Sequence, residues 1–430
     1  MLDARNVLVF PCGSEIGLEI RRALRYCRHV RLIGASSIRD HGDFVYPDAV
    51  EPLPWVTAPD FPSAFDAVLR SRRIEYVFPA HDEVLVRLAE RAAEAGFAAE
   101  ILAPEAGVCR LCRSKRATYA FFADKIPTPR QYRAEELASA VFPLFMKPDA
   151  GQGSRGAAKV DGADVAVERL RRSPTDLLME FLPGHEYTVD CFTDRLGRLA
   201  YCAGRTRARV ANGISVNSRD FPDMRFRRLA EIINRHLPLR GAWFFQLKED
   251  AAGEAKLLEI APRIAGTSGF RRALGVNLPL LSLYDRMGLD VEVVENRLAG
   301  VEVDRALGAV YRLPFDYRTV YVDLDDTLIL GDAVNGEAVR FLYQCLNRGK
   351  RLVLLTRHAA DPESTLRRFR LDRLFDQVIW LRNGEPKSAA IGDGKEAILL
   401  DDSFAERREA AAALGIPVFD PAALECLIDP

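Results

Sequence analysis

The stretch FMKPDAGQGSRG, residues 145–156, decides how most of this chain can be interpreted. A short apolar run ends at Lys147, and a turn containing Gly151, Gly153 and Gly156 follows. Glycine permits positive φ and close backbone approach, so successive N–H groups can point at phosphate oxygens while the lysine supplies a point charge. The pattern predicts a nucleotide phosphate clamp, with a plain β-hairpin as the alternative. It is not a Walker P-loop, because that motif has its lysine directly after the last glycine.

Length and composition narrow the class of protein. The chain has 430 residues, which predicts several domains of roughly 150 residues each. Hydrophobic residues make up 48% and charged residues 28%, and the mean hydropathy of −0.07 is typical of a soluble protein. The net charge of −1 and the lack of a long apolar run predict neither a nucleic-acid partner nor a membrane partner. Because no signal-peptide pattern is present, we expect a cytoplasmic protein with reduced thiols at its eight cysteines.

The first 108 residues alternate strand-like and helical runs, for example NVLVF followed by IGLEIRRALRYC. This βαβ pattern predicts a small parallel sheet. The turn PCGSEIG lacks the full GxGxxG fingerprint, so we expect no dinucleotide site there. His81 and Asp82 follow a strand-like run, where they either contact a substrate at the ligand-binding edge of the sheet or cap a helix.

Acidic residues recur in the segment LLMEFLPGHEYTVDCFTD, downstream of the glycine turn. Glu180 ends one apolar run, and Glu186, Thr188 and Asp190 alternate along the next. Backbone groups near Leu182 can hold an adenine edge, with Glu186 placed for ribose hydroxyls. The alternative is an ordinary hairpin with solvated acids.

Two further strand-like runs, WFFQLKED and KLLEIAPRI, predict a hairpin that places Gln246 beside Glu259. Oxygen ligands on neighbouring strands suit Mg²⁺. A glutamate inside an apolar strand costs several kcal/mol unless it is paired or bound to a metal ion, which favours the metal interpretation for Glu259. Arg263 is expected at the same end of the sheet, near a transferred phosphate.

The order and spacing of these residues, with Lys115 on a predicted helix, resemble the ATP-grasp superfamily over about the first 300 residues. The likeness is nearest to the carbamoyl-phosphate-synthase-like and amino-acid-ligase branches. It implies Mg²⁺, or Mn²⁺ in its place, bound by Gln246 and Glu259, and a catalytic Arg263 that also binds substrate together with Arg205. It implies ATP as a cofactor, bound by Lys115, Lys147, Gly151, Gly153, Ser154, Glu180, Leu182 and Glu186.

The reaction that this resemblance implies is phosphorylation of a carboxylate by ATP, followed by capture of the acyl phosphate by an amine. Such a transfer requires charge neutralisation more than covalent help from the protein. Ala261 departs from the family pattern Glu-x-Asn-Pro-Arg, so we expect a second metal ion to be held more weakly or to be completed by another group. Further candidate substrate contacts, with solvated surface positions as the alternative, are Arg207, Arg209 and Arg271.

A second set of motifs begins at VYVDLDDTLIL, residues 320–330. Three aspartates after a buried strand are an electrostatic liability unless a cation lies among them. Later strand-like runs end at Thr356 and at Asp401 and Asp402, with Lys387 between them in sequence. Because parallel strands bring their carboxyl ends to one edge, we expect these groups to meet at the ligand-binding edge of a doubly wound sheet.

These motifs resemble the haloacid-dehalogenase-like (HAD) phosphatase superfamily over residues 317–430. The resemblance implies that Asp323 is the nucleophile that becomes an aspartyl phosphate and that Asp325 is the general acid and base. It implies that Thr356 and Lys387 bind the phosphoryl group. The short sequence distance between Asp323 and Thr356 leaves no room for a large cap domain. The implied Mg²⁺ ligands are Asp323, Asp325, Asp401 and Asp402.

We therefore expect a multidomain α/β and α+β protein: a small parallel α/β domain at 1–108, an ATP-grasp fold at 109–312 and a HAD-like doubly wound α/β domain at 317–430. The expected function is an ATP-dependent carboxylate–amine ligase fused to a phosphatase. The expected partners are a small carboxylic or amino acid, an amine and a small phosphorylated metabolite, and a homodimer is left open. Two alternatives remain: a carboxylate kinase without an amine acceptor, and a HAD domain that binds without catalysis.

Overall fold

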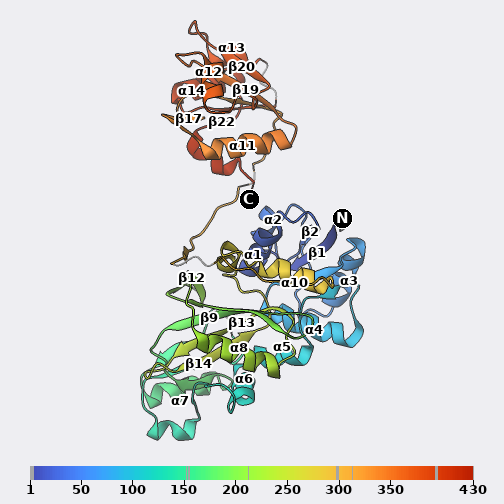
Figure 1. Cartoon of the computed structure of the whole chain (residues 1–430), viewed down its shortest axis with the longest axis vertical. Helices are drawn as coiled ribbons and strands as arrows, with labels where there is room; N and C mark the ends of the chain where they lie inside the picture. Colours follow the sequence, from blue (N-terminus) through green and yellow to red (C-terminus); the bar gives the residue numbers. More distant parts are fainter. Residues whose placement is uncertain are drawn as a thin grey trace. The chain divides into compact units, whose positions relative to one another are not determined.

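The computed structural model describes residues 4–151, 153, 155–211, 213–296, 300–311, 313–392 and 396–429. The chain divides into two compact units, Met1–Leu307 and Gly308–Pro430, which Figure 1 shows as ribbons. Each unit has its own sheets and its own hydrophobic clusters.

The first unit begins with a four-stranded parallel sheet in the order β2-β1-β3-β4, which confirms the sheet that the βαβ pattern predicts. Its strands are β1 (Arg5–Phe10), β2 (Val30–Gly34), β3 (Tyr76–Pro79) and β4 (Glu100–Ile101). The accompanying helices are α1 (Glu15–Leu24), α2 (Gly42–Val45), α3 (Phe61–Ser71), α4 (Asp82–Ala95) and α5 (Ala106–Arg113). Helices α1 and α4 start at the carboxyl edge of this sheet, directly after β1 and β3.

A second, antiparallel sheet in the order β5-β8-β6-β7 carries the glycine turn. Its strands are β5 (Gln131–Tyr132), β6 (Leu144–Lys147), β7 (Ala158–Val160) and β8 (Leu177–Glu180). The helices nearby in sequence are α6 (Lys115–Phe122), the 3₁₀ helix η1 (Ala134–Ser139) and α7 (Ala163–Arg172). The turn therefore joins two paired strands, β6 and β7, and Lys147 is the last residue of β6.

A third sheet, antiparallel in the order β10-β9-β13-β14, has one apolar and one polar face. Its strands are β9 (Glu186–Thr193), β10 (Leu199–Thr206), β13 (Gly241–Glu249) and β14 (Ala255–Ala261), and helix α8 spans Met224–His236. Odd-numbered residues of β9 from Tyr187 to Cys191 pack with apolar residues of α8 in one buried cluster. Because side chains alternate along a strand, the even-numbered residues from Glu186 to Asp190 lie on the opposite face.

The remaining part of the first unit is a small antiparallel sheet, β11-β12-β15, and two helices. Helix α10 packs against both β13 and α1, so it connects the third sheet with the first. Apolar residues of these elements share one buried cluster. The bounds are β11 (Arg209–Ala211), β12 (Ile214–Arg219), β15 (Glu302–Asp304), α9 (Gly269–Ala273) and α10 (Leu278–Arg286).

The second unit is built on a five-stranded parallel sheet in the order β20-β19-β16-β21-β22. Its strands are β16 (Thr319–Val322), β19 (Arg351–Thr356), β20 (Gln377–Trp380), β21 (Ala397–Leu400) and β22 (Val418–Phe419), and a hairpin is formed by β17 (Ile329–Leu330) and β18 (Ala333–Val334). Its helices are α11 (Gly336–Asn347), α12 (Pro362–Arg368), α13 (Lys387–Ile391), α14 (Phe404–Leu414) and the 3₁₀ helix η2 (Pro421–Cys426).

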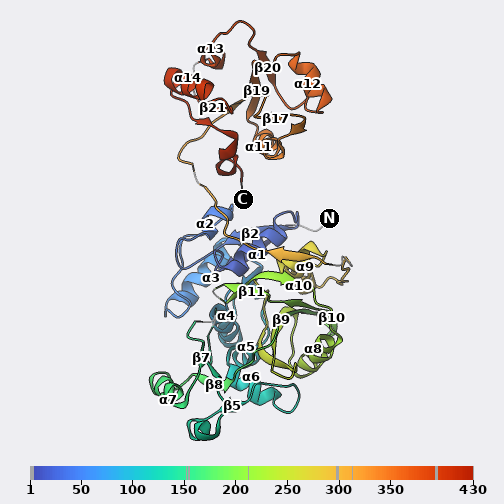
Figure 2. The ribbon, with the colours of Figure 1, turned by 90° about the vertical axis from the view of Figure 1, so that its left-hand side faces the viewer.

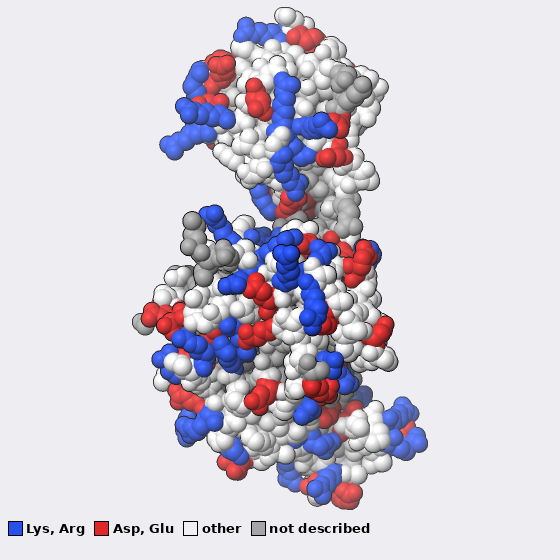
Figure 3. Space-filling view, turned by 90° about the vertical axis from the view of Figure 1, so that its right-hand side faces the viewer, with Lys and Arg blue, Asp and Glu red and all other residues white. Residues whose placement is uncertain are grey.

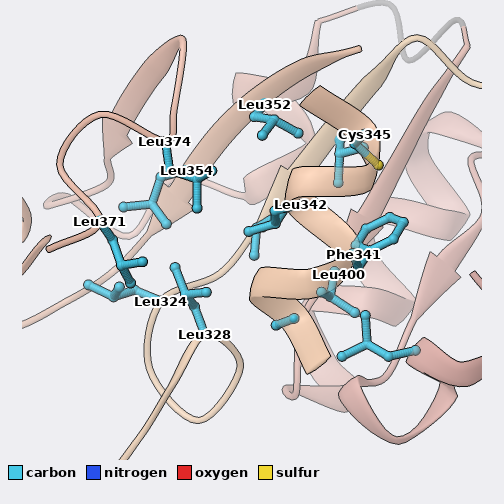
Figure 4. Packing of buried hydrophobic residues seen from close by; sticks show 14 of the residues in the cluster. Leu324, Leu328, Phe341, Leu342, Cys345, Leu352, Leu354, Leu371, Leu374 and Leu400 are labelled. Carbon is cyan, nitrogen blue, oxygen red and sulfur yellow. The ribbon is translucent and has the colours of Figure 1, made fainter. Parts of the chain in front are cut away.

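Helices cover both faces of this sheet. Helices α11 and α12 lie on one side and α13 and α14 on the other (Figure 2). Figure 4 shows Phe341 and Leu342 of α11 among leucines such as Leu354 of β19 and Leu400 of β21. The second cluster, on the opposite face, includes Val353 of β19. Burial on both faces explains why the central strands read as continuous apolar runs.

The exterior of each unit carries both signs of charge. On the face shown in Figure 3, Lys and Arg side chains lie interspersed with Asp and Glu side chains. Among the described residues, no helix combines the length and the apolar character that crossing a bilayer requires.

Candidate active sites

A cavity of about 660 Å³ lies in the first unit. Its walls come from the carboxyl edge of the parallel sheet, from the glycine turn and from the polar face of the third sheet. Ser154, also predicted here, lies outside the described residues. The other residues that the resemblance to ATP-grasp proteins implies as ligands of ATP, metal ion or substrate all line the cavity: Lys115, Lys147, Gly151, Gly153, Glu180, Leu182, Glu186, Arg205, Gln246, Glu259 and Arg263.

In one row of charged side chains on the cavity floor, the charges are already paired with one another. Arg207 Nε donates to Glu186 Oε1 at 2.6 Å, and Lys248 Nζ donates to Glu186 Oε2 at 3.4 Å. Arg207 Nη2 also donates to the carbonyl of Gly213 at 2.9 Å. Glu186 thus lies between two cations, and Arg207 is held by the protein rather than free for a ligand.

The next row crosses all four strands of the third sheet. Arg205, Thr188, Gln246 and Glu259 are in register from β10 through β9 and β13 to β14. Residues in register lie on one face, roughly 5 Å from their neighbours. Thr188 is 1% exposed and its hydroxyl has no hydrogen-bond partner, and the side chains of Gln246 and Glu259 have no hydrogen bond or ion pair within the described part of the chain. This polar row therefore holds the unused oxygen groups of the cavity.

Behind this row is a buried ion network. Arg205 Nε donates to Asp190 Oδ2 at 2.8 Å, and Arg271 Nε donates to the same oxygen at 3.3 Å. Arg271 is fully buried and also donates to Asp220 at 2.7 Å. Arg205 lines the cavity, but Asp190 holds its guanidinium. Neither Arg271, which lies behind the wall, nor Arg209, whose exposed side chain pairs with Asp304, lines the cavity as expected of substrate contacts.

Lys147 brings a positive charge into the cavity without a carboxylate partner among the described residues. Its Nζ donates to the Tyr119 hydroxyl at 2.9 Å, and that hydroxyl donates to the carbonyl of Leu258 at 2.8 Å. Burial, reinforced by the nearby Lys115 ammonium, lowers the pKa of Lys147 to about 8. An ammonium in this position gains most from an anionic ligand.

Lys115 acts on the glycine turn itself. Its Nζ donates to the carbonyls of Asp149 at 3.2 Å and Gly151 at 3.3 Å, and its side chain is buried. Gly153 and Gly156 have φ values of 64° and 76°, which a side chain would rarely permit. Lys115 therefore ties the carbonyls of the turn to helix α6, and the positive φ values match the backbone geometry that the sequence predicts.

The cavity has an apolar end next to the turn. Phe145, Met179, Phe181, Leu182 and Leu258 line it. Glu180, at the end of β8, accepts a hydrogen bond from the backbone N–H of Arg130 at 2.9 Å, and Lys256 lies 3.8 Å from it. This end offers apolar side chains beside a strand terminus, which suit a heteroaromatic ring.

Arg263 is held by a residue of the parallel sheet region. Its Nε and Nη2 donate to the two carboxylate oxygens of Asp82 at 2.6 and 2.8 Å. Burial opposes ionisation of Asp82, but Arg263 outweighs burial and lowers the pKa of Asp82 to about 2. His81 is the N-cap of α4 and accepts from the backbone N–H of Glu83, so the cap interpretation is confirmed for His81. Asp82 orients Arg263 at the cavity wall.

Ala261 offers no ligand atom at the position where the family pattern has asparagine. It is buried and packs in a small apolar cluster with Phe244 and Ala265. Gln246 and Glu259 are therefore the neighbouring oxygen-bearing side chains on β13 and β14 at this end of the hairpin.

The second unit gathers its acidic residues at the carboxyl edge of its sheet, as the strand pattern predicts. Oxygens of Asp323, Asp401 and Asp402 lie within 4.8 Å of one another. Lys387 Nζ donates to Asp323 Oδ1 at 2.7 Å and to Asp401 Oδ2 at 2.6 Å. Burial raises the pKa of Asp323 to about 6, against the opposing effect of Lys387. The chemistry of these three carboxylates suits a divalent cation.

Asp325, predicted as a further metal ligand, is not part of this carboxylate cluster. Both of its carboxylate oxygens lie 2.9 Å from His358 Nδ1, and His358 Nε2 lies 2.9 Å from the Thr365 hydroxyl. The Thr356 hydroxyl accepts from the backbone N–H of His358 at 3.0 Å. The loop after β19 therefore holds Asp325 away from the cluster and orients its carboxylate.

Three side chains at these sites were not predicted from the sequence. Tyr119 and Thr188 carry no charge and stand in ordinary helix and strand patterns. His358 follows a motif threonine by two residues, which was the available signal. Their contacts with Lys147, the polar row and Asp325 arise only from pairing across the fold.

Comparisons with known proteins show what the fold of the first unit is similar to. A family model described as "ATP-grasp in the biosynthetic pathway with Ter operon" matches residues 172–307. No curated protein matches the sequence. The biotin carboxylase domain of 2-oxoglutarate carboxylase from Hydrogenobacter thermophilus, in complex with MgADP, ADP and bicarbonate, is similar with a TM-score of 0.58 and 12% identity, covering 69% of this chain and 72% of that one.

Two further solved structures have the same fold. N5-carboxyaminoimidazole ribonucleotide synthetase from Thermus thermophilus is similar with a TM-score of 0.54 and 16% identity, over 66% of this chain and 79% of that one. L-amino acid ligase from Bacillus licheniformis is similar with a TM-score of 0.51 and 16% identity, over 66% and 74%. ATP and Mg²⁺, expected from the sequence, are consistent with the MgADP of the carboxylase structure. The family match over residues 172–307 and the shared fold show that the first unit is similar to ATP-grasp proteins.

Proposed function

We propose that this chain is an ATP-dependent carboxylate–amine ligase joined to a Mg²⁺-dependent phosphatase. The proposed ligase domain is 109–312, preceded by a domain at 1–108, and the proposed phosphatase is 317–430. The observation that supports the ligase most is a cavity that combines Lys147, a cation without a carboxylate partner among the described residues, with the unused oxygens of Thr188, Gln246 and Glu259. One structure of similar fold is named as an L-amino acid ligase.

In the ligase, each part of the cavity has a matching part of the reactants. Lys147 and the glycine turn suit the phosphates of ATP, and the apolar end around Leu182 suits adenine. Gln246 and Glu259 would hold Mg²⁺, which supplies charge neutralisation at the phosphates. Arg263, oriented by Asp82, suits an oxyanion of the acid or of the transferred group.

The proposed reaction has two balanced steps. An oxygen of the substrate carboxylate attacks the γ-phosphorus of ATP, so a P–O bond forms and ADP leaves with the electrons of the broken bond. The amine nitrogen then attacks the acyl carbon, phosphate leaves, and the nitrogen loses a proton. The protein contributes position and charge rather than covalent chemistry.

ADP release tests the ligase. Asp323→Asn protein is incubated with ATP, Mg²⁺ and pairs drawn from a panel of carboxylic acids, amino acids and amines, so that phosphatase turnover does not obscure the product. Release that requires both an acid and an amine supports the ligase. Release with an acid alone indicates a carboxylate kinase, and the absence of both MgATP binding and release contradicts the proposal.

Thr188→Val is expected to weaken binding of MgATP or of the acid by about tenfold, because the valine keeps the shape and removes the buried hydroxyl. Stability is expected to stay equal or to rise, since the hydroxyl is buried and has no hydrogen-bond partner in the described part of the chain. Calorimetric binding, KM values and thermal unfolding measure these effects.

Ser268→Ala is the matched control for Thr188→Val. Ser268 also has a buried hydroxyl without a hydrogen-bond partner among the described residues, but it does not line the cavity. We expect Ser268→Ala to bind like the wild type and Thr188→Ser to restore most of the affinity. Unchanged binding and rates in Thr188→Val would show that the hydroxyl meets no ligand.

For the second unit, the proposed phosphatase resembles HAD enzymes. Asp323 attacks the phosphorus of an ester, the ester P–O bond breaks, and Asp325 gives a proton to the leaving oxygen. Water, deprotonated by Asp325, then hydrolyses the aspartyl phosphate. Lys387 and Thr356 suit the phosphoryl oxygens, and Asp323, Asp401 and Asp402 would hold Mg²⁺, which neutralises charge there.

His358→Ala is expected to lower kcat for phosphate esters by about 10- to 100-fold with little change in KM. The histidine orients Asp325, and small misplacements of a catalytic group cost this much. Thr365→Val removes only the hydroxyl that contacts the other ring nitrogen, so its loss should be smaller and in the same direction. A wild-type kcat in His358→Ala would exclude the positioning role.

A further inference from the structure

The proposed phosphatase site leaves its leaving-group side uncovered. Only the short β17–β18 hairpin stands between β16 and α11 within this part of the second unit. The Asp325 side chain, which would face the leaving oxygen, is 53% exposed. Recognition of the leaving group therefore depends on side chains at the rim of the site.

Trp380 stands at this rim. It is the last residue of β20 and is in register with Thr356, the last residue of β19. Its indole Nε1 donates to the carbonyl of His358 at 2.8 Å, and His358 in turn contacts Asp325. These contacts fix the indole ring beside the loop that orients Asp325.

Arg382 lies against this ring. Its guanidinium carbon is 3.5 Å from the centroid of the Trp380 ring, and its side chain is exposed. Within the described residues the Arg382 side chain has no hydrogen bond or ion pair, whereas Arg357 pairs with Glu406 at 2.9 Å and Arg407 pairs with Asp420 at 3.0 Å. A guanidinium over the face of an indole ring can still donate its N–H groups to an anion.

The net charge of the proposed phosphatase site explains how the Arg382 guanidinium would favour an anionic leaving group. Even when Asp325 carries the proton that it donates, the carboxylates of Asp323, Asp401 and Asp402 and the charges of the bound phosphoryl group outnumber the Lys387 ammonium and a bound Mg²⁺. A phosphate ester with an anionic leaving group would be repelled by this set. An arginine at the rim whose side chain has no partner in the described part of the chain offsets that repulsion through charge-assisted hydrogen bonds.

We infer that Trp380 and Arg382 form a leaving-group subsite that selects phosphate monoesters whose leaving group carries a second anion, either a carboxylate or a further phosphate. This inference rests on the proposed phosphatase function. Arg382 supplies the forked donors, and the Trp380 ring holds the guanidinium at the rim.

Matched ester pairs test the subsite in the full chain with Mg²⁺. The carboxylate arm compares 3-phosphoglycerate with glycerol 3-phosphate, and the phosphate arm compares fructose 1,6-bisphosphate with fructose 6-phosphate. We expect the wild type to prefer the anionic member of at least one pair. Arg382→Gln should lose about tenfold of that preference through KM, with kcat and the neutral member unchanged.

Arg373→Gln is the control. Arg373 is also an exposed arginine whose side chain has no hydrogen-bond or ion-pair partner in the described chain, but it precedes β20 and so lies toward the opposite edge of the sheet. It should keep the wild-type preference. The subsite is overturned if the wild type shows no preference or if Arg382→Gln keeps it. Hydrolysis of no ester, or hydrolysis that survives Asp323→Asn, would instead refute the phosphatase function itself.

Discussion

Replacing Asp323 with asparagine is expected to abolish phosphate-ester hydrolysis, lowering kcat by about 10⁴-fold or more. The amide is a poor nucleophile and a weak ligand for a divalent cation, so one substitution removes two parts of the proposed mechanism. The fold should persist, because Lys387 keeps its contact with Asp401 at 2.6 Å. Ester hydrolysis with Mg²⁺ and thermal unfolding measure both effects.

The neighbouring Asp326 provides the control for this substitution. It belongs to the same motif but lies outside the carboxylate cluster, and its φ of 53° is one that asparagine tolerates. Asp326→Asn should therefore keep most of the activity. Equal losses in the two variants would mean that the motif is structural, and activity retained in Asp323→Asn would favour a binding module over a phosphatase.

Replacing Lys147 with alanine is expected to weaken MgATP binding by about 10²- to 10³-fold and to abolish ADP release with it. Lys147 lines the cavity and its ammonium has no carboxylate partner among the described residues, so its charge is available to the phosphates. Its partner Tyr119 keeps a hydrogen bond to the carbonyl of Leu258, which limits damage to the fold. Calorimetric titration with MgADP and a non-hydrolysable MgATP analogue measures the change.

Lys125→Ala removes the same charge outside the cavity, where Lys125 pairs with Asp124. Its nucleotide affinity should equal that of the wild type. If Lys147→Ala bound nucleotide normally while remaining folded, the glycine turn would be a hairpin without a phosphate role.

The pH dependence of binding follows from the same lysine. The pKa of Lys147 is about 8 in the free protein, and bound phosphate favours the protonated form, so the pKa rises in the complex. Binding therefore takes up a proton above pH 8, and affinity falls as pH rises through this range. At pH 9 affinity should be about tenfold weaker than at pH 7. Lys147→Ala should lack this step, and a flat wild-type profile would contradict the assignment.

Much of the local organisation could be read from residue types and spacing. The βαβ pattern of the first 108 residues, the hairpin that pairs Gln246 with Glu259, and the parallel strands of the second unit all appear in the structure. These features depend on local backbone preference and on which face of a strand is apolar, and both are written along the chain. Asp323 and Thr356 come directly at strand ends, and parallel pairing alone brings such ends to one edge.

The ion-pair partner of each charged side chain could not be predicted from residue types and spacing. Arg263 was expected to be available to substrate, and the structure pairs it with Asp82 of a different sheet region. Asp325 was expected on the metal ion, and His358 holds it elsewhere. Such pairs join residues far apart in sequence, and their choice depends on how sheets and loops pack.

The sequence by itself determined which chemical groups this protein carries and on which strand ends and turns they stand, because backbone propensity and alternation are local. Only the tertiary structure decided which of these groups are already paired and which remain available. Glu186 and Arg205 are held by protein partners, whereas the buried hydroxyl of Thr188 has none among the described residues. Strand register and packing across the fold decide which groups pair. Burial makes this choice important, because a buried polar group without a partner costs more free energy than an exposed one.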